Sequence, residues 1–357
     1  TVLDAHDKVL FPGMVEAASS GSMDLANENI PLVPFISVRE SINPTASYFE
    51  DLLRNGITTV QIIQGTETII GGYGAILKPT GNTLESMLRK EPGMMRISLG
   101  ADSRHSRIRK MATLRQTFQE TLIYRETLQS KENLEISTVL SPHLYLESAD
   151  PVKQPLIDLI EGRLIALIHC PEPGDCFRAL ELAKTFQFKP ILQLGPRAFL
   201  AADLLKQAGV SILLDSEISL QEDFKGQGDL ETVILPLIYH QKGIPFCLSS
   251  RGRRFLWYQA GLALQGGLPR EEALKSITLY PAQILGLEKE IGSLIEGKSA
   301  DFVILSGDPL DIRTWVEEVW IEGKKVYSRK EDIRLKHFSG EPSQNTVSTE
   351  TPKKTEK

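Results

Sequence analysis

The sequence is poor in cysteine, has no long apolar stretch and carries no excess of positive charge. Its 357 residues include only Cys170, Cys176 and Cys247, too few for a dense disulfide framework. No apolar run approaches the ~20 residues of a membrane-spanning helix. Lys and Arg number 40 against 46 Asp and Glu, which gives a net charge of −6. We therefore expect a soluble protein that has no membrane span and does not bind nucleic acid.

The two ends of the chain also lack clear signals. The sequence begins with Thr1 rather than Met, and no basic segment followed by an apolar stretch stands at the start. We expect that a native N-terminal segment is missing, so a signal peptide stays an open question and the compartment is not indicated. At the other end, residues 331–357 are expected to form a disordered polar tail, because Glu341 to Lys357 hold a single aliphatic side chain and no aromatic one.

Between the ends, short β-rich runs alternate with helical patterns. Strands are predicted at residues 57–63, 164–169, 190–194, 210–214 and 245–249, and helices at 111–128, 174–187, 197–208 and 229–242. This alternation predicts a parallel α/β fold, either a barrel or an open sheet. Residues 2–11, 302–305 and 316–327 indicate strands, the last with a turn at Glu322–Gly323, and are predicted to form one small β-unit from both chain ends.

Several motifs resemble the amidohydrolase superfamily. They are LFPGMVE at residues 10–16, ALKSITLYPAQILG at 273–286 and IGSLIEGKSADFVI at 291–304, while GITTV at 56–60 and IGGYGA at 70–75 resemble its imidazolonepropionase-like branch. The resemblance implies a (β/α)8 TIM-like barrel over residues 12–290, with a partial β-sandwich built from 1–11 and 291–330. It also implies a site at the C-terminal ends of the barrel strands, where metal-activated water attacks a carbon–nitrogen bond.

The same resemblance implies a set of metal ligands, and most of them are replaced in this sequence. The family has a His-x-His pair after the first strand, a Lys on the fourth, a His on the fifth and sixth, and an Asp on the eighth. These positions fall, in that order, at Ala18, Ser20, Arg96, His169, Leu194 and Arg251. A catalytic zinc ion typically needs three protein ligands, and His169 alone does not supply them. We therefore expect no metal or other cofactor.

Two functions stay open at this point. The first is a pseudoenzyme-like barrel that has lost metal-dependent hydrolysis and binds a small molecule, an anion, a partner protein or a second copy of itself. Its candidate residues are His169, the ligand-binding candidates Gly72, Tyr73, Arg96 and Arg251, and the neighbouring Arg253 and Arg254. The alternative is an active hydrolase of cyclic-amide or other non-peptide carbon–nitrogen bonds. It would need zinc or a similar metal in a site rebuilt from Glu16, His143, Glu172 and Asp175.

Overall fold

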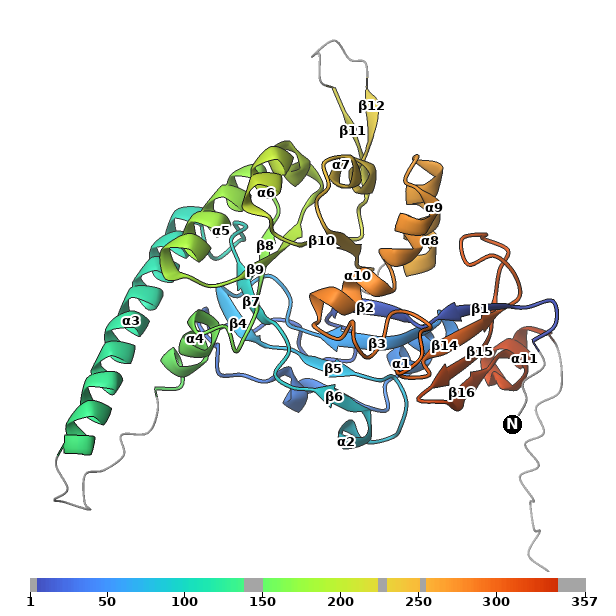
Figure 1. The fold of residues 1–357 in the computed structure, drawn as a ribbon, viewed down its shortest axis with the longest axis horizontal. Coiled ribbons are helices and arrows are strands. Elements are labelled where there is room, and N and C mark those ends of the chain that lie inside the picture. The colour runs from blue at the N-terminus through green and yellow to red at the C-terminus, as the bar shows by residue number, and fades with distance from the viewer. Residues whose placement is uncertain (1–4, 138–149, 224–229, 251–254, 340–357) are drawn as a thin grey trace, which may run out of the picture.

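The largest sheet of the molecule is the parallel sheet that the alternating pattern predicts. The computed structural model describes residues 5–137, 150–223, 230–250 and 255–339 (Figure 1). The sheet has the strand order β13-β10-β9-β8-β7-β4, and its neighbours are parallel except β4 and β7. The strands are β4 (Ile70–Tyr73), β7 (Met95–Ser98), β8 (Ala166–Cys170), β9 (Pro190–Leu194), β10 (Ile212–Leu214) and β13 (Phe246–Leu248).

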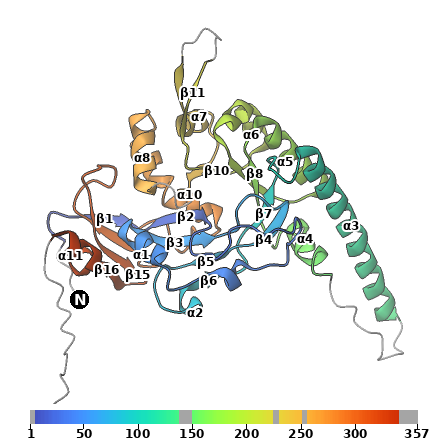
Figure 2. The same ribbon diagram turned by 180° about the vertical axis from the view of Figure 1, so that it is seen from behind.

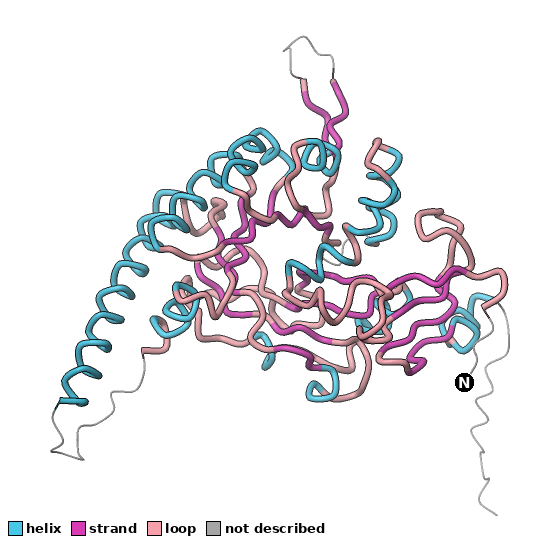
Figure 3. The backbone as a smooth tube through the Cα atoms, viewed as in Figure 1, coloured by secondary structure: helices cyan, strands magenta, loops and turns pink. Residues whose placement is uncertain are grey.

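Helices connect these strands and lie along their outer side, as Figure 3 shows. The longest is α3 (Arg107–Ser137), which extends the helix predicted at 111–128 and runs along one edge of the molecule, away from the terminal sheet (Figure 2). The other connections contain α4 (Lys153–Ile160), α5 (Pro173–Phe186), η2 (Pro196–Ala201), α6 (Ala202–Ala208) and α7 (Leu235–Gln241). After β13 come α8 (Leu256–Gln265), α9 (Arg270–Lys275) and α10 (Leu279–Ile284). None of the helices among the described residues is long and apolar enough to cross a membrane.

A second sheet stands beside the first and has the order β2-β3-β5-β6. Its strands are β2 (Met14–Ser19), β3 (Ile57–Ile62), β5 (Ala75–Leu77) and β6 (Leu88–Lys90), accompanied by η1 (Val38–Ser41), α1 (Ser47–Arg54) and α2 (Leu84–Met87). Among the described residues, the backbone hydrogen bonds between strands form these two separate sheets and do not close them into a barrel. Side chains join them, because Ser249 and Ser250, just after β13, bind Glu16 on β2. The fold is thus mixed α/β and consistent with a TIM-barrel-like architecture.

Both ends of the described chain meet in a third sheet. This is the small β-unit that the sequence predicts from both chain ends. Its order is β1-β14-β15-β16, formed by β1 (Val9–Pro12), β14 (Phe302–Leu305), β15 (Val316–Ile321) and β16 (Lys324–Ser328), all antiparallel. The turn at Glu322 and Gly323 has φ of 51° and 74°, the left-handed region that a tight hairpin needs. The described residues form one sheet here, and they do not include a facing layer that would make it a sandwich.

Two sequence predictions need correction. The helix predicted at 229–242 is wrong in its first part, because β12 (Glu231–Ile234) pairs with β11 (Ser219–Glu222) as an antiparallel hairpin. The disordered tail does not begin at residue 331. Residues 329–331 form η3 (Arg329–Glu331), α11 (Ile333–Ser339) follows, and the Asp332 carboxylate accepts a 2.6 Å hydrogen bond from Arg54. Residues 340–357 lie outside the described part of the chain.

Side chains on the parallel sheet alternate between two apolar clusters. Ile97, Ile168 and Leu192 pack on the outer side in one cluster with the helices, and Leu167 and Ile191 belong to the second, inner cluster. This alternation follows from the period of two of a β-strand. The three cysteines are buried, and burial raises the pKa of the Cys170 and Cys247 thiols. They therefore serve as packing residues.

Candidate functional site

Three inner positions of the parallel sheet carry polar side chains at the same level. Ser98 on β7 is in register with His169 on β8, and His169 is in register with Gln193 on β9. Neighbouring strands lie about 4.8 Å apart, so these side chains stand side by side near the C-terminal ends of the strands. Arg96 lies two residues before Ser98, on the same face. We call these four residues the inner polar layer.

Arg96 is the buried cation of this layer. The residue is only 2% exposed, yet its guanidinium keeps its proton in any protein environment. Its Nε donates to the backbone oxygen of Gln64 at 3.0 Å, and its Nη1 donates to Oε1 of Gln193. The Gln64 side chain in turn accepts a 2.6 Å hydrogen bond from the backbone N–H of Gly72. The position of the positive charge is therefore set by neighbours on β9 and on the loop after β3.

Two polar groups of the layer and one beside it have no hydrogen-bond partner among the described residues. Within the described residues, no hydrogen-bond partner exists for the Ser98 hydroxyl, the Gln193 amide nitrogen or the hydroxyl of Thr68. Thr68 lies close by, since a Cβ added to Gly71 would meet both Thr68 and Arg96. Ser98 and Gln193 are 0% exposed and Thr68 is 1% exposed, whereas His169 is half-buried. Buried polar groups are nearly always satisfied in folded proteins, so this cluster is an exception within the described residues.

Glu16 is a second buried polar residue, and it lies where β2 meets the end of β13. Its carboxylate accepts hydrogen bonds from the Ser249 hydroxyl at 2.6 Å, the Ser250 N–H at 2.8 Å and the Ser250 hydroxyl at 2.5 Å. The Ser249 hydroxyl also lies 3.0 Å from the backbone oxygen of Ala18. Complete burial raises the pKa of the Glu16 carboxyl, and the hydrogen bonds from both serines offset only part of that rise. Glu16 thus acts as a structural link between the two sheets.

The Glu16 link predicts a pH-dependent stability. Because the pKa of Glu16 is higher in the folded chain than in the unfolded chain, its contribution is fully present below about pH 4.5 and is lost as pH rises through the raised pKa. Glu16→Gln cannot titrate and should lack this decline. We expect the free energy of unfolding of wild type to fall relative to that of Glu16→Gln as pH rises. Urea unfolding from about pH 4 to about pH 8 measures it, and a constant difference would contradict the assignment.

The residues at the family's metal-ligand positions do not all face the interior in this structure. Ala18 is buried in the inner apolar cluster, and Ser20 follows the end of β2. Leu194 packs in the outer cluster with the helices, so the inner position on β9 is Gln193 rather than Leu194. This corrects the sequence mapping by one residue. Arg251, Arg253 and Arg254 lie outside the described residues.

Gly72 and Tyr73 do not share one surface. A Cβ at Gly72 would come within 2.0 Å of the Ile36 backbone oxygen, so glycine is required there by close packing of the backbone. Tyr73, at the end of β4, instead lines a cavity of about 490 Å³ together with Phe35, Glu91 and Pro155. This cavity lies beside α4 on the outside of the sheet.

The residues considered for a rebuilt metal site have other roles. Glu172 is the N-cap of α5, and the buried Asp175 pairs with Arg107 at 2.9 Å and with Arg178 at 3.3 Å. His143 belongs to the part of the chain that is not described. No group of three or more His, Cys, Asp or Glu able to hold a metal ion exists among the described residues.

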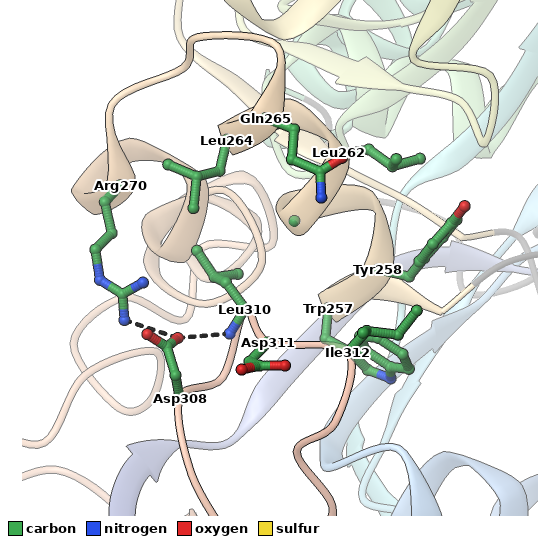
Figure 4. Close-up of a pocket in the computed structure, with 11 residues that line it drawn as sticks. Trp257, Tyr258, Leu262, Leu264, Gln265, Arg270, Asp308, Leu310, Asp311 and Ile312 are labelled. Atoms are coloured by element: carbon green, nitrogen blue, oxygen red, sulfur yellow. Dashed lines mark hydrogen bonds and ion pairs between the residues drawn. The ribbon is translucent and has the colours of Figure 1, made fainter.

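A further cavity, of about 380 Å³, opens between α8 and the loop that follows β14 (Figure 4). Trp257 and Tyr258 line it from α8, and the Arg270–Asp308 ion pair of 2.9 Å closes one side. None of the residues predicted from the sequence lines this cavity. It lies at the junction with the terminal sheet, away from the inner polar layer.

Comparisons with known proteins agree with this architecture. Residues 251–327 match the family model "Amidohydrolase family". An amidohydrolase, tasK, of Hapsidospora irregularis is 25% identical over 175 residues, which are 46% of this chain and 17% of that protein. An imidazolonepropionase of Shewanella baltica is 32% identical over 133 residues, 37% of this chain and 24% of that protein. The matched part thus covers less than a quarter of each relative.

A solved structure shows the fold over nearly the whole chain. The crystal structure of an amidohydrolase from Thermotoga maritima superposes with a TM-score of 0.81 at 24% identity, covering 92% of this chain and 90% of that one. The family model covers only the closing motifs near the C-terminus, at residues 251–327. The C-terminal part of the chain is thus similar to the amidohydrolase family, and nearly the whole chain shares its fold with an amidohydrolase structure.

Proposed function

We propose that this chain is a metal-independent amidohydrolase homologue, which binds a ligand in the interior of its barrel-like fold instead of hydrolysing carbon–nitrogen bonds. The observation that carries the proposal is the buried guanidinium of Arg96 in the inner polar layer. It stands at the position where the family resemblance implies a metal-binding lysine. Arginine offers no lone pair to a metal, and it brings a permanent positive charge.

Electrostatics support the same conclusion. At an effective dielectric constant of about 20, two unit charges 4 Å apart interact by about 4 kcal/mol, so a divalent cation at that distance from Arg96 would be repelled by roughly 8 kcal/mol. The remaining donor set does not compensate, because Ala18 offers a methyl group, and Leu194 packs on the outer side of the sheet. Only His169 among these positions keeps a ligand type. The residues present do not fit the family's metal site.

The proposal is tested by measuring metal content of the full chain after expression with zinc supplied. We expect less than about a tenth of an equivalent of metal per chain by elemental mass spectrometry, since a catalytic site would hold one. A panel of cyclic-amide and dipeptide-like substrates should show no hydrolysis that depends on His169, with His169→Ala as the matched control. Metal close to one equivalent, together with activity lost in His169→Ala, would overturn the proposal and establish a working hydrolase.

A further inference from the structure

We infer that the cavity beside α4 binds an organic ammonium ion, that is, a positively charged amine attached to an apolar body. This cavity, which we call the α4 cavity, has a volume of about 490 Å³, within the range of small-molecule sites. Its lining combines the carboxylates of Glu91 and Asp158 with the rings of Phe35 and Tyr73. No Lys or Arg belongs to the lining among the described residues. The inference goes beyond the proposed function and does not depend on it.

The α4 cavity lies at the N-terminal edge of the parallel sheet. Met95 and Ala166, the first residues of the parallel strands β7 and β8, are in register. Tyr73 pairs with Met95, and Leu164, another residue of the lining, stands just before β8. The inner polar layer lies near the opposite ends of these strands. The cavity is therefore separate from the C-terminal strand ends, where the family resemblance implies a site.

One face of α4 forms a wall of the cavity. Gln154, Pro155 and Asp158 lie on this face and line the cavity, since residues one turn apart in a helix are neighbours on its surface. Leu156 and Leu159 are buried in the outer apolar cluster, so they hold the other face of the helix against the protein. Both views of the ribbon show α4 next to β4 (Figures 1 and 2). The polar face is thus held at the sheet edge by the packing of the apolar one.

Two aromatic rings offer a surface for the ligand. Phe35 is 44% exposed and Tyr73 is half-buried, so a small molecule in the cavity reaches both. Partial burial and the negative charge of Glu91 raise the pKa of the Tyr73 hydroxyl, and this ring and carboxylate are therefore neighbours in the cavity. An ammonium group is attracted both by a carboxylate and by the face of an aromatic ring. The rings also cover the apolar body of the ligand.

The carboxylate of Glu91 is only partly neutralised by its neighbours. The Ser37 hydroxyl donates to its Oε1, while its Oε2 lies 3.8 Å from Nη1 of Arg39, beyond hydrogen-bond distance. Arg39 also pairs with Glu85 at 3.3 Å. One guanidinium is thus shared between two carboxylates. The Glu91 side chain is 18% exposed, so a ligand can reach it.

Asp158 has the same arrangement on α4. Its Oδ1 accepts from Nε of Arg163 at 2.9 Å and from the Gln154 amide at 3.4 Å, and Arg163 also pairs with Glu161. Among the described residues, these two networks hold four carboxylates and two guanidinium groups, an excess of two negative charges. A cleft lined by charge of one sign concentrates ligands of the opposite sign. The charge of the α4 cavity therefore favours a cation.

The test compares 2-phenylethylammonium with its neutral match, 2-phenylethanol, because the two molecules differ only in the ammonium and hydroxyl groups. Each is titrated by calorimetry into the full-length chain at constant ionic strength and about pH 7, where Asp and Glu are ionised. We expect the ammonium compound to bind at least about tenfold more tightly than the alcohol, since its contacts with carboxylates are charge-assisted. Equal affinities, or no binding of the ammonium compound, would overturn the inference.

Four variants locate the binding. Glu91→Gln and Asp158→Asn each remove one charge from the lining and keep the shape of the side chain, so each should weaken binding of the ammonium compound about tenfold. The matched controls are Glu85→Gln and Glu161→Gln, which remove the other carboxylate of each shared guanidinium and do not line the cavity. Their effect should stay within about twofold, because charges outside the cavity are screened by salt. Equal losses in all four variants would show a general effect of charge and contradict a site in the α4 cavity.

Tyr73 separates a binding role from a structural one. Tyr73→Phe keeps the ring and should bind the ammonium compound like wild type. Tyr73→Leu removes the ring and should weaken the ammonium compound several-fold more than the alcohol, since only the cation gains from the ring face. Thermal melting without ligand checks that both variants are folded. If Tyr73→Leu weakened both compounds equally, or neither, the aromatic wall would not recognise the charge and the inference would be wrong.

Discussion

Replacing Asp301 with alanine is expected to lower the free energy of unfolding by about 3–5 kcal/mol. Asp301 pairs with Lys78 at the end of β5, and the side chains of Lys78 and Asp301 are 7% and 2% exposed. The other carboxylate oxygen accepts from the Glu322 N–H at 2.9 Å and from the Ser299 hydroxyl at 2.7 Å. Alanine would leave the Lys78 ammonium buried without its carboxylate. It would also break the connection between the second sheet and the terminal hairpin.

Urea unfolding of Asp301→Ala at neutral pH measures this effect. The matched control is Glu317→Ala, which removes a 3.3 Å ion pair with Lys8 whose two side chains are 23% and 37% exposed. Surface pairs of this kind contribute at most about 1 kcal/mol. If Asp301→Ala cost no more than the control, the buried pair would have no special role.

Asp102→Asn is expected to cost about 3 kcal/mol, for a related reason at the other side of the sheet. Asp102 follows β7, and its carboxylate lies 2.7 Å from the Nζ of Lys110, whose side chain is 0% exposed. It also accepts from the N–H groups of Arg104 and His105, both at 2.8 Å. Removing the carboxylate charge leaves a buried ammonium at the start of α3. The first turns of this helix should then separate from the sheet.

The same carboxylate makes stability sensitive to acid. Partial burial raises the pKa of Asp102, but Lys110 and the two N–H groups outweigh it and lower the pKa from 3.8 to about 2. Its contribution is therefore present above about pH 4 and is lost as pH falls toward about pH 2. Asp102→Asn should remove this loss. Asp311→Asn is the control, because Asp311 pairs with Arg313, whose side chain is 86% exposed, and a pair in solvent contributes little to stability. This variant should change the acid profile little.

Much of the fold follows from local patterns. The strand predicted at 302–305 is β14, and the turn predicted at Glu322–Gly323 joins β15 to β16, because alternation and turn residues are local properties. The segment 229–242 is mispredicted since Glu231–Ile234 becomes a strand only by pairing with Ser219–Glu222. That pairing is a tertiary contact, which helical periodicity does not report.

The sequence predicts only part of the candidate site. The family motifs locate Arg96 and His169 on the inner face, yet they assign Leu194 to the interior when Gln193 occupies it. A slip of one residue moves a strand side chain to the other face. Gln193 carries a usable signal, because it is an isolated polar residue between apolar neighbours in the strand predicted at 190–194. Ser98 likewise stands between Ile97 and Leu99, but no strand is predicted there. Their lack of acceptors, however, depends on the packing of three strands and is visible only in the structure.

The terminal sheet has a consequence for the synthesis of this protein. β1 pairs with β14 through Val9 and Leu305, so one edge of that sheet leaves the ribosome long before its partner does. At about 5–20 residues per second, the delay is on the order of 15–60 seconds. During that time the exposed edge of β1, which carries Val9 and Leu10, is open to pairing with other chains. Nascent chains of this protein can therefore aggregate through β1 until β14 is made, and a chaperone that shields β1 would act during that interval.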